Sequence, residues 1–258
     1  MQCIVTRTKK AVQPRTKALA RKLKAHLVEL GKEPLHTDLV WITVPDDSIA
    51  QVAGKLAGVQ DWRGKIVFHS SGALTSDELA SLRSGKARVA SVHPMMTFVR
   101  GSAPNVAEAV FALEGDVAAT RVAREIVERL GADAFPIRKQ NKVLYHAFGS
   151  FASPLVIALM ASLEQVALAA GIAKRKIKPV IVPLLRQTLR NYLKQDAASA
   201  FSGPWARGDV STLRKHLQEL KSVPEARAVY LALAKSAVKS LPVRNRKAVE
   251  RELQNPEK

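Results

Sequence analysis

Short apolar runs alternate with helix-forming stretches over roughly the first 140 residues, and this alternation restricts the fold more than any other feature of the chain. The strongest run, Leu39 to Val44, is continuously apolar, as is typical of a strand in a parallel sheet covered on both faces. Further strands are predicted at residues 2–6, 26–30, 65–69, 88–92 and 109–113. Strands that alternate with helices predict an α/β fold with a parallel sheet and helices on both faces.

Polar residues mark the starts of the helices between these strands. Asp46 follows a strand and is expected to cap a helix over residues 48–56 by accepting its free amide hydrogens. Thr75 to Glu78 has the pattern of a capping box that opens a helix reaching Arg83. A further helix is predicted over residues 117–130, and Gly131 ends it.

The second half of the chain predicts helices almost throughout. Apolar residues recur at three- and four-residue steps from Leu144 to Ala170, which indicates one long helix that Pro154 should kink. Helices are also predicted over 176–194, over 211–220 with Asp209 as the cap, and from 222 onward. The polar stretch Arg138–Lys142 separates the two halves, so we expect an α/β domain at 1–140 and an all-helical domain at 141–258.

The charge of the chain is strongly positive, because 41 lysine and arginine residues oppose 22 acidic residues and give +19. Such a chain attracts polyanions, including nucleic acid. However, the basic residues occur along the whole chain, and the aromatic content of 5% does not interleave with the basic runs to form a stacking platform. A solvated basic surface is therefore the favoured interpretation over nucleic-acid binding.

Composition also bears on the compartment. One cysteine, Cys3, excludes an internal disulfide and favours a reducing cytoplasm. The longest apolar run, Leu155 to Leu163, ends at Glu164, well short of the about 20 residues that a membrane span needs. We therefore expect neither a membrane span nor, from the polar N-terminus, secretion.

Three clusters that could carry chemistry stand at the ends of predicted strands, where ligands bind in open parallel sheets. They are Val44-Pro45-Asp46, His69-Ser70-Ser71-Gly72 and His93-Pro94-Met95. Each cluster alone is also explained by ordinary turn chemistry or by a structural histidine. Their placement on successive strand ends favours a functional site.

Six phrases spread over roughly residues 3–235 resemble one bacterial family, described as Rossmann-like plus domain of unknown function 2520, among the relatives of 6-phosphogluconate dehydrogenase. The phrases are LVWITVPDDSI, IVFHSSGAL, VASVHPMMTF, FALEGD, LYHAFGSFAS and FSGPWARGD. The resemblance implies an NAD(P)-binding domain followed by a helical domain that commonly dimerises. The HPM phrase is also similar to that of prephenate dehydrogenases, in which the histidine contacts the substrate hydroxyl.

The resemblance implies roles for individual residues. Val44, Pro45, Asp46 and Gly72 would line the nicotinamide side of a cofactor groove, and Ser70 and Ser71 would lie beside nicotinamide and substrate. His93 would exchange the substrate proton near neutral pH while hydride moves to or from the cofactor. The remaining substrate-site candidates are Met95, Tyr145, His146, Arg207 and Asp209. For His146, packing is an equal alternative, and Arg207 and Asp209 could instead only shape a helix start.

One departure from the family pattern concerns the phosphate-binding turn. None of the 13 glycines forms a G-x-G, so the family's first strand and its G-x-G-x-x-G turn are absent. The opening residues look like the family's second strand and its following turn, so Thr6, Arg7, Thr8 and Lys9, with Lys10, would favour NADP over NAD. A solvated basic helix start is the alternative for this segment.

Loss of the first strand would leave a gap in the sheet unless its neighbours pair directly, and each buried unpaired backbone group costs about 1–3 kcal/mol. We therefore hypothesise that the natural protein begins about 25–30 residues upstream, the length of one strand, turn and helix. Pro154 is a second departure, since the family usually has asparagine there, and any polar role at that position is in doubt.

Two functions follow as alternatives. The first is an NADP-dependent oxidoreductase, with NAD as a further possible cofactor, that acts on a small hydroxy, oxo or imino acid as a homodimer through the helical domain. The second is a catalytically silent basic protein that binds polyanions or partner proteins. A metal enzyme has little support, because His69 and His93 come from separate strand ends without clustered carboxylates.

Overall fold

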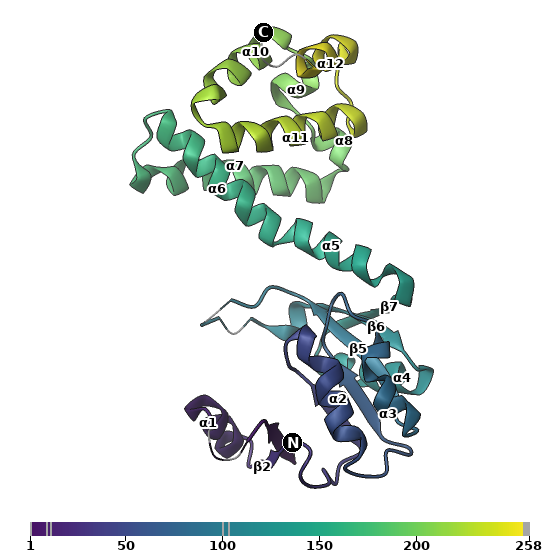
Figure 1. Cartoon of the computed structure of the whole chain (residues 1–258). Helices are drawn as coiled ribbons and strands as arrows, with labels where there is room; N and C mark the ends of the chain where they lie inside the picture. The colour runs from purple at the N-terminus through teal and green to yellow at the C-terminus, as the bar shows by residue number, and fades with distance from the viewer. Residues whose placement is uncertain (1, 9, 11, 100, 103, 255–258) are drawn as a thin grey trace. The chain divides into compact units, whose positions relative to one another are not determined.

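The computed structural model describes residues 2–254 apart from 9, 11, 100 and 103, and it divides into two compact units, Met1–Ala152 and Ser153–Lys258 (Figure 1). The boundary falls after Ala152, so the helix that carries Tyr145 and His146 belongs to the first unit rather than to a domain beginning at residue 141.

The first unit combines two sheets with helices. Its strands are β1 (Cys3–Thr6), β2 (His26–Glu29), β3 (Leu39–Ile42), β4 (Ile66–His69), β5 (Arg88–Met95), β6 (Val110–Gly115) and β7 (Asp133–Pro136). Its α-helices are α1 (Pro14–Lys22), α2 (Ile49–Ala57), α3 (Ala80–Ser84), α4 (Val117–Arg129) and α5 (Lys142–Ala152), and its 3₁₀ turns are η1 (Asp46–Ser48), η2 (Ser76–Leu79), η3 (Val106–Glu108) and η4 (Lys139–Asn141).

The main sheet has five strands in the order β3-β4-β5-β6-β7. β3, β4 and β5 are parallel, with Ile42 beside His69 and His69 beside Ser91, so their carboxyl ends lie at one edge. β6 runs antiparallel to β5, which corrects the prediction of an all-parallel sheet. The described part of the connection between β5 and β6 carries only the turn η3, whereas a parallel crossover usually needs a helix.

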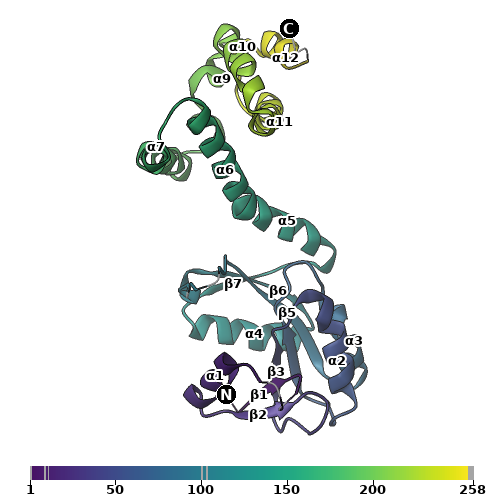
Figure 2. The ribbon, with the colours of Figure 1, turned by 60° about the vertical axis from the view of Figure 1, so that its left-hand side comes forward.

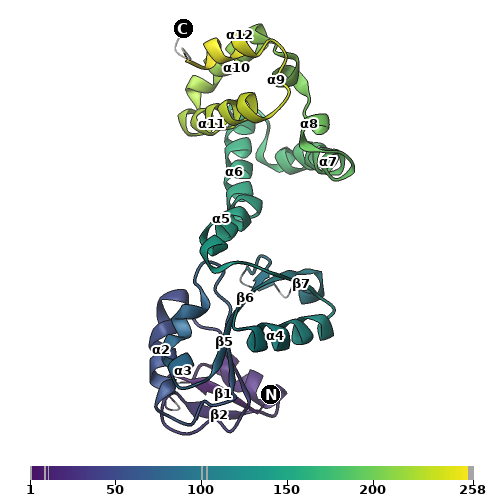
Figure 3. The ribbon, with the colours of Figure 1, turned by 90° about the vertical axis from the view of Figure 1, so that its right-hand side faces the viewer.

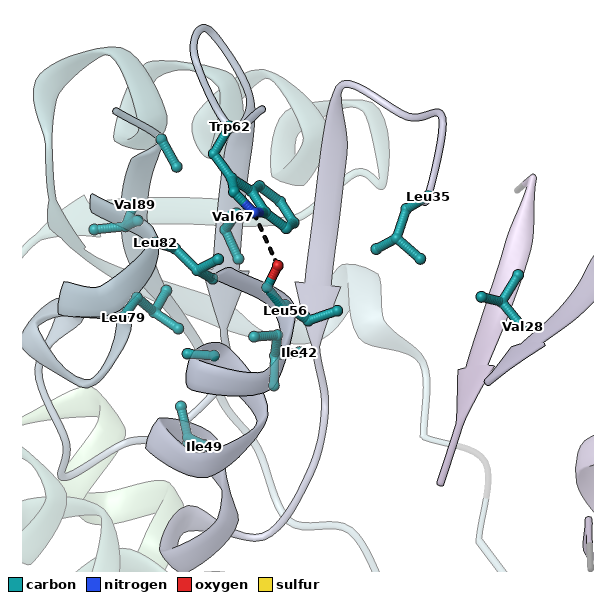
Figure 4. Packing of buried hydrophobic residues seen from close by; sticks show 12 residues of the cluster. Val28, Leu35, Ile42, Ile49, Leu56, Trp62, Val67, Leu79, Leu82 and Val89 are labelled. Atoms are coloured by element: carbon teal, nitrogen blue, oxygen red, sulfur yellow. Dashed lines mark hydrogen bonds between the residues drawn. The ribbon is translucent and has the colours of Figure 1, made fainter. Parts of the chain in front are cut away.

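Alternate residues of the strands face opposite cores, as expected for a sheet covered on both faces. Val67 and Val89 pack with α2 and α3, and Figure 4 shows this cluster with the hydrogen bond of 3.0 Å that Trp62 Nε1 donates to the Leu56 carbonyl. Phe68 and Ala90, one residue further along, pack on the other face against α4. Figure 3 shows α2 and α3 on one side of β5 and α4 on the other.

β1 and β2 form a separate parallel pair, and among the described residues no ladder joins β1 to β3. The sheet therefore has the expected gap and does not close by direct pairing of its neighbours. Apolar contacts hold the pair to the unit instead, because Cys3, Val5 and Val28 belong to the same core as β3 and β4. In Figure 2 the β1–β2 pair is labelled beside β3.

The second unit is helical, as predicted. Its helices are α6 (Pro154–Ala169), α7 (Lys174–Lys194), α8 (Ala197–Ala200), α9 (Gly203–Arg207), α10 (Val210–Glu219), α11 (Pro224–Ser240) and α12 (Arg246–Gln254), with the turn η5 (Leu220–Ser222). A core of Leu213, Ala234, Val238, Val249 and Leu253 joins α10, α11 and α12. Pro154 stands at the first position of α6 and Ser153 precedes it, so the predicted kink is a break between α5 and α6.

The helical stretch Lys139–Ala169 is long and apolar enough to cross a membrane, judged by length and composition alone. None of its most apolar window is buried within the chain. This differs from the expectation drawn from the run at Leu155–Leu163, because the apolar residues on either side of that run extend the window. The same length and composition also suit a helix that another protein surface covers.

Candidate functional site

The three predicted strand-end clusters meet at the carboxyl edge of β3, β4 and β5. Ser71 Oγ, after β4, donates a hydrogen bond of 2.6 Å to Asp46 Oδ2, after β3. The same hydroxyl accepts one of 2.9 Å from the Leu74 amide. Asp46 therefore ties two strand ends together, and α2 has no side-chain cap, which corrects the predicted capping role.

Ser70 and His69 hold this edge in place. Ser70 Oγ accepts a hydrogen bond of 2.8 Å from Trp41 Nε1 on β3. His69 is fully buried, its Nδ1 accepts from the Ser71 amide at 3.1 Å, and its Nε2 lies 3.0 Å from the Thr75 carbonyl. Because burial lowers the pKa of His69, this ring is neutral and serves the turn rather than a ligand.

Gly72 lies where two imidazole rings approach the backbone. A Cβ atom added to Gly72 would lie 2.6 Å from His146 Cδ2 and 2.8 Å from His93 Nε2. These separations are shorter than any van der Waals contact, so a residue with a side chain cannot occupy this position without moving the rings. Glycine here reflects close packing around His93.

His93 is paired with Tyr145 from α5. The distance from His93 Nδ1 to the Tyr145 hydroxyl is 2.8 Å, and the rings meet edge to face with centroids 5.6 Å apart. Burial, then the positive charges of Lys142 and His146, lowers the pKa of His93 to about 4, against an opposing effect of Asp46. The ring is therefore neutral near pH 7, whereas the sequence suggested a group that titrates there.

Tyr145 remains a phenol under the same conditions, because burial raises its pKa to about 12. A buried phenol needs an acceptor for its proton, and Nδ1 of the neutral ring is the one that the structure provides. In that arrangement the proton of His93 is on Nε2, the atom on the Gly72 side.

Lys142 is the site residue that sequence reasoning missed. Its side chain is 0% exposed, and its Nζ donates to the Ser71 carbonyl at 2.9 Å and to Ser91 Oγ. Burial lowers its pKa to about 8, and Glu114 and Asp46 oppose that effect. Its position one helical turn before Tyr145, on the buried face of α5, is the signal that could have revealed it.

The other first-unit candidates lie around this centre or at β1. Met95, on β5, packs against α5, since a Cβ on Gly149 would lie 2.8 Å from Met95 Sδ. Val44 packs against the core of α2 and α3, and Pro45 is exposed before η1.

The basic segment follows β1. Thr6 Oγ1 donates to the Val28 carbonyl at 3.3 Å, Arg7 is exposed, and Thr8 Oγ1 accepts from the Lys10 amide at 3.3 Å. Lys9 lies outside the described residues. The segment thus presents a cation and hydroxyls beyond the carboxyl end of a strand.

Arg207 and Asp209 lie in the second unit, Arg207 at the end of α9. Asp209 caps α10, as predicted, by accepting from the Thr212 amide at 3.1 Å and the Thr212 hydroxyl at 2.8 Å. These bonds support its structural role. Within the described part of the chain, no group of three or more metal-ligating side chains is present.

Comparisons with known proteins find one matching family and several solved structures with a similar fold. The family model described as "Domain of unknown function (DUF2520)" matches residues 109–237, and no curated protein matches the chain. Protein TM1727 from Thermotoga maritima is 24% identical, with a TM-score of 0.72 over 96% of this chain and 90% of its own length.

Two further solved structures share the fold. Protein BF3122 from Bacteroides fragilis, provisionally named an NADP oxidoreductase, is 18% identical, with a TM-score of 0.70 over 92% of this chain and 87% of its own. An imine reductase from Myxococcus stipitatus, solved with NADP⁺, is 17% identical, with a TM-score of 0.59 over 93% and 84%. At these identities the likeness shows a common fold, a Rossmann-like unit followed by a helical one.

Proposed function

The chain belongs to the DUF2520 family, and on that premise we propose that it is an NADP-dependent oxidoreductase acting on a small hydroxy, oxo or imino acid. The observation that carries the proposal is the arrangement of His93, Tyr145 and Gly72 at the carboxyl edge of three parallel strands. Ligands of open α/β sheets bind at this edge. The imine reductase of the same fold, solved with NADP⁺, supports the choice of cofactor and the inclusion of imines among the substrates.

The described residues fit two parts of a dinucleotide. Arg7, exposed beyond β1 with Thr6 and Thr8 beside it, suits the 2′-phosphate that distinguishes NADP from NAD, and this favours NADP, with NAD as the weaker ligand. Val44, Pro45 and Asp46 suit the nicotinamide side. The chain has no glycine-rich turn for the pyrophosphate, so we assign no residue to that part.

His93 is the residue to which we assign the substrate proton. NADPH, when bound, supplies a hydride to the substrate carbon. With Tyr145 donating to Nδ1, neutral His93 holds a proton on Nε2. When that proton passes to a substrate oxygen or nitrogen, the hydroxyl proton of Tyr145 passes to Nδ1, so that His93 stays neutral, and solvent then reprotonates the Tyr145 phenolate. Ser71 and Ser70 shape the edge, and Met95 and exposed His146 border it.

The test is consumption of NADPH with a panel of small oxo and imino acids. At least one acid should be reduced, and His93→Asn should lower kcat/KM by about 10²–10⁴-fold. His26→Asn, an exposed histidine on β2, is the matched control and should keep full activity. Turnover that is equal in His93→Asn and the wild type would contradict the role of His93.

We also propose that the protein works as a homodimer through the helical unit. α6 buries none of its residues and α7 buries only Ile177, although both are rich in apolar side chains. Cavities of about 520 Å³ and 460 Å³ flank α6, and both are lined mainly by apolar residues. A second copy would cover these surfaces, as the resemblance to dimerising relatives suggests.

Light scattering on the purified chain checks this. We expect twice the 28.1 kDa of one chain, and Leu184→Glu on exposed α7 should shift the protein toward the monomer. A monomer at micromolar concentration, or partition of the protein into lipid vesicles, would contradict the proposed dimer.

A reducing cytoplasm is the compartment that we propose, because Cys3 is the single cysteine.

The second candidate function is a catalytically silent protein that binds polyanions or partner proteins through its basic surface. The net charge of +19 favours it. Binding that weakens steeply with salt would distinguish it from the first function.

A further inference from the structure

We propose that Lys142 is a positioning residue for His93: its buried ammonium fastens α5 to the ends of β4 and β5 and so holds Tyr145 and Gly72 against the His93 ring. This role rests on the proposed function of His93, and its test does not depend on the oxidoreductase activity.

Two parallel contacts join α5 to β5. Ser91 and His93 are two residues apart on β5, so their side chains point to the same face of the sheet. Lys142 and Tyr145 are three residues apart on α5, so they lie on the same side of the helix. Lys142 contacts Ser91, and Tyr145 contacts His93, which makes two adjacent rungs between helix and strand.

The burial of α5 follows this pattern. Lys142 is 0% and Tyr145 8% exposed, whereas Val143 and Leu144 between them are 71% and 76% exposed. A lysine thus occupies the packed side of the helix while apolar residues point away from the unit. Because burying an ammonium is costly, its hydrogen bonds must compensate.

The ammonium also reaches the end of β4. Lys142 Nζ and Ser91 Oγ both donate to the Ser71 carbonyl, at 2.9 Å and 3.0 Å, and Ser91 Oγ accepts from Lys142. The carbonyl that receives both bonds belongs to the peptide that leads into Gly72, which packs against His93. The Lys142 side chain therefore fixes the positions of the helix, the strand and the turn that surround His93.

Charge is the second effect of Lys142 on His93. Lys142 forms no ion pair among the described residues, since both of its hydrogen bonds go to neutral oxygens. Its positive charge therefore acts on the His93 ring and disfavours the imidazolium form. The titratable groups that face the two residues are Asp46 on η1, His69 on β4, Glu114 on β6, and Tyr145 and His146 on α5.

The test follows the ring Cε1–H signal of His93 by NMR as a function of pH, in the full chain without ligand. His93→Asn identifies the signal among the 6 histidines. Lys142→Met removes the ammonium and keeps the side-chain volume, and we expect the pKa of His93 to rise by about one unit. Lys139→Met, an exposed lysine one turn earlier that pairs with Asp77, is the matched control and should leave this pKa unchanged.

The wild type supplies a measurement that does not depend on the folding of Lys142→Met. Because the pKa of Lys142 is lowered to about 8, its deprotonation should produce a second step in the His93 signal near that pH. Lys139→Met should keep this step. A His93 pKa in Lys142→Met equal to that of the wild type overturns the proposal, and so does a wild-type His93 signal without a second step anywhere in the alkaline range.

Discussion

Substitution of Gly72 tests the packing of the site, because a single methyl group would collide with two rings. In Gly72→Ala the new Cβ would start 2.6 Å from His146 Cδ2 and 2.8 Å from His93 Nε2. No positive φ is found at Gly72, so alanine is allowed by the backbone and the whole effect is steric. The rings must move by roughly 1 Å to reach ordinary contact distances.

The cost depends on how freely each ring moves. His146 is exposed and can rotate away, whereas His93 is held by the Tyr145 hydroxyl at 2.8 Å. Displacing His93 weakens that hydrogen bond, which contributes about 1 kcal/mol, and disturbs the surrounding packing. Overpacking of this kind usually costs about 1–3 kcal/mol, and we expect a destabilisation in that range.

The assay is urea unfolding of the wild type, Gly72→Ala and Gly54→Ala. Gly54 lies inside α2 with no atom within 4 Å of an added Cβ, so the same substitution there should stabilise the chain by up to about 1 kcal/mol. Adding His146→Ala to Gly72→Ala should recover only part of the loss, since the collision with His93 remains. A Gly72→Ala protein as stable as the wild type would refute the packing described here.

Three further predictions concern the supports of the site and of the helical unit. The pKa of His93 is about 4 in the folded protein and near 6.5 in the unfolded chain, so the folded protein binds fewer protons between these pH values. The stability of the wild type should therefore fall as the pH drops from 6.5 to 4, and urea unfolding across this range should show a smaller fall for His93→Asn. Glu114→Ala should lower the free energy of unfolding by about 2–3 kcal/mol, because the buried carboxylate accepts hydrogen bonds from the Ser76 amide at 2.7 Å and from the Ser76 hydroxyl at 2.8 Å. A loss below about 0.5 kcal/mol in thermal or urea unfolding would contradict this role of the carboxylate. Asp209→Ala should cost about 1 kcal/mol by uncapping α10, whereas Asp209→Asn should retain most of the stability.

The fold class and the family could be predicted from the sequence because both depend on local patterns, and both predictions are confirmed. The apolar run Leu39–Val44 and the spaced apolar residues Ile49, Ala53 and Leu56 specify their elements with few competing interpretations. The edge strand Asp133–Pro136 was missed, since it is short, largely exposed and ends in proline. The antiparallel direction of β6 depends on the path of the preceding connection, which no local pattern encodes.

The site was predicted in outline only. Strand ends could be aligned from the parallel order, so Asp46, Ser71 and Gly72 were grouped from the sequence, and the structure brings them together with His93. Lys142 was not found, because a lysine at the end of a polar stretch is usually exposed and its burial depends on how α5 docks on β5. The low pKa of His93 also depends on that docking.

Binding of a nicotinamide cofactor at the strand-end site is tested by a fluorescence titration of the chain with NADPH. We predict micromolar binding that is tighter for NADPH than for NADH and is weakened at least tenfold by Arg7→Glu, with Lys10→Glu showing a smaller loss. Binding of DNA or RNA that weakens steeply with salt, together with no NADPH binding, would contradict the claim and favour the silent, polyanion-binding alternative.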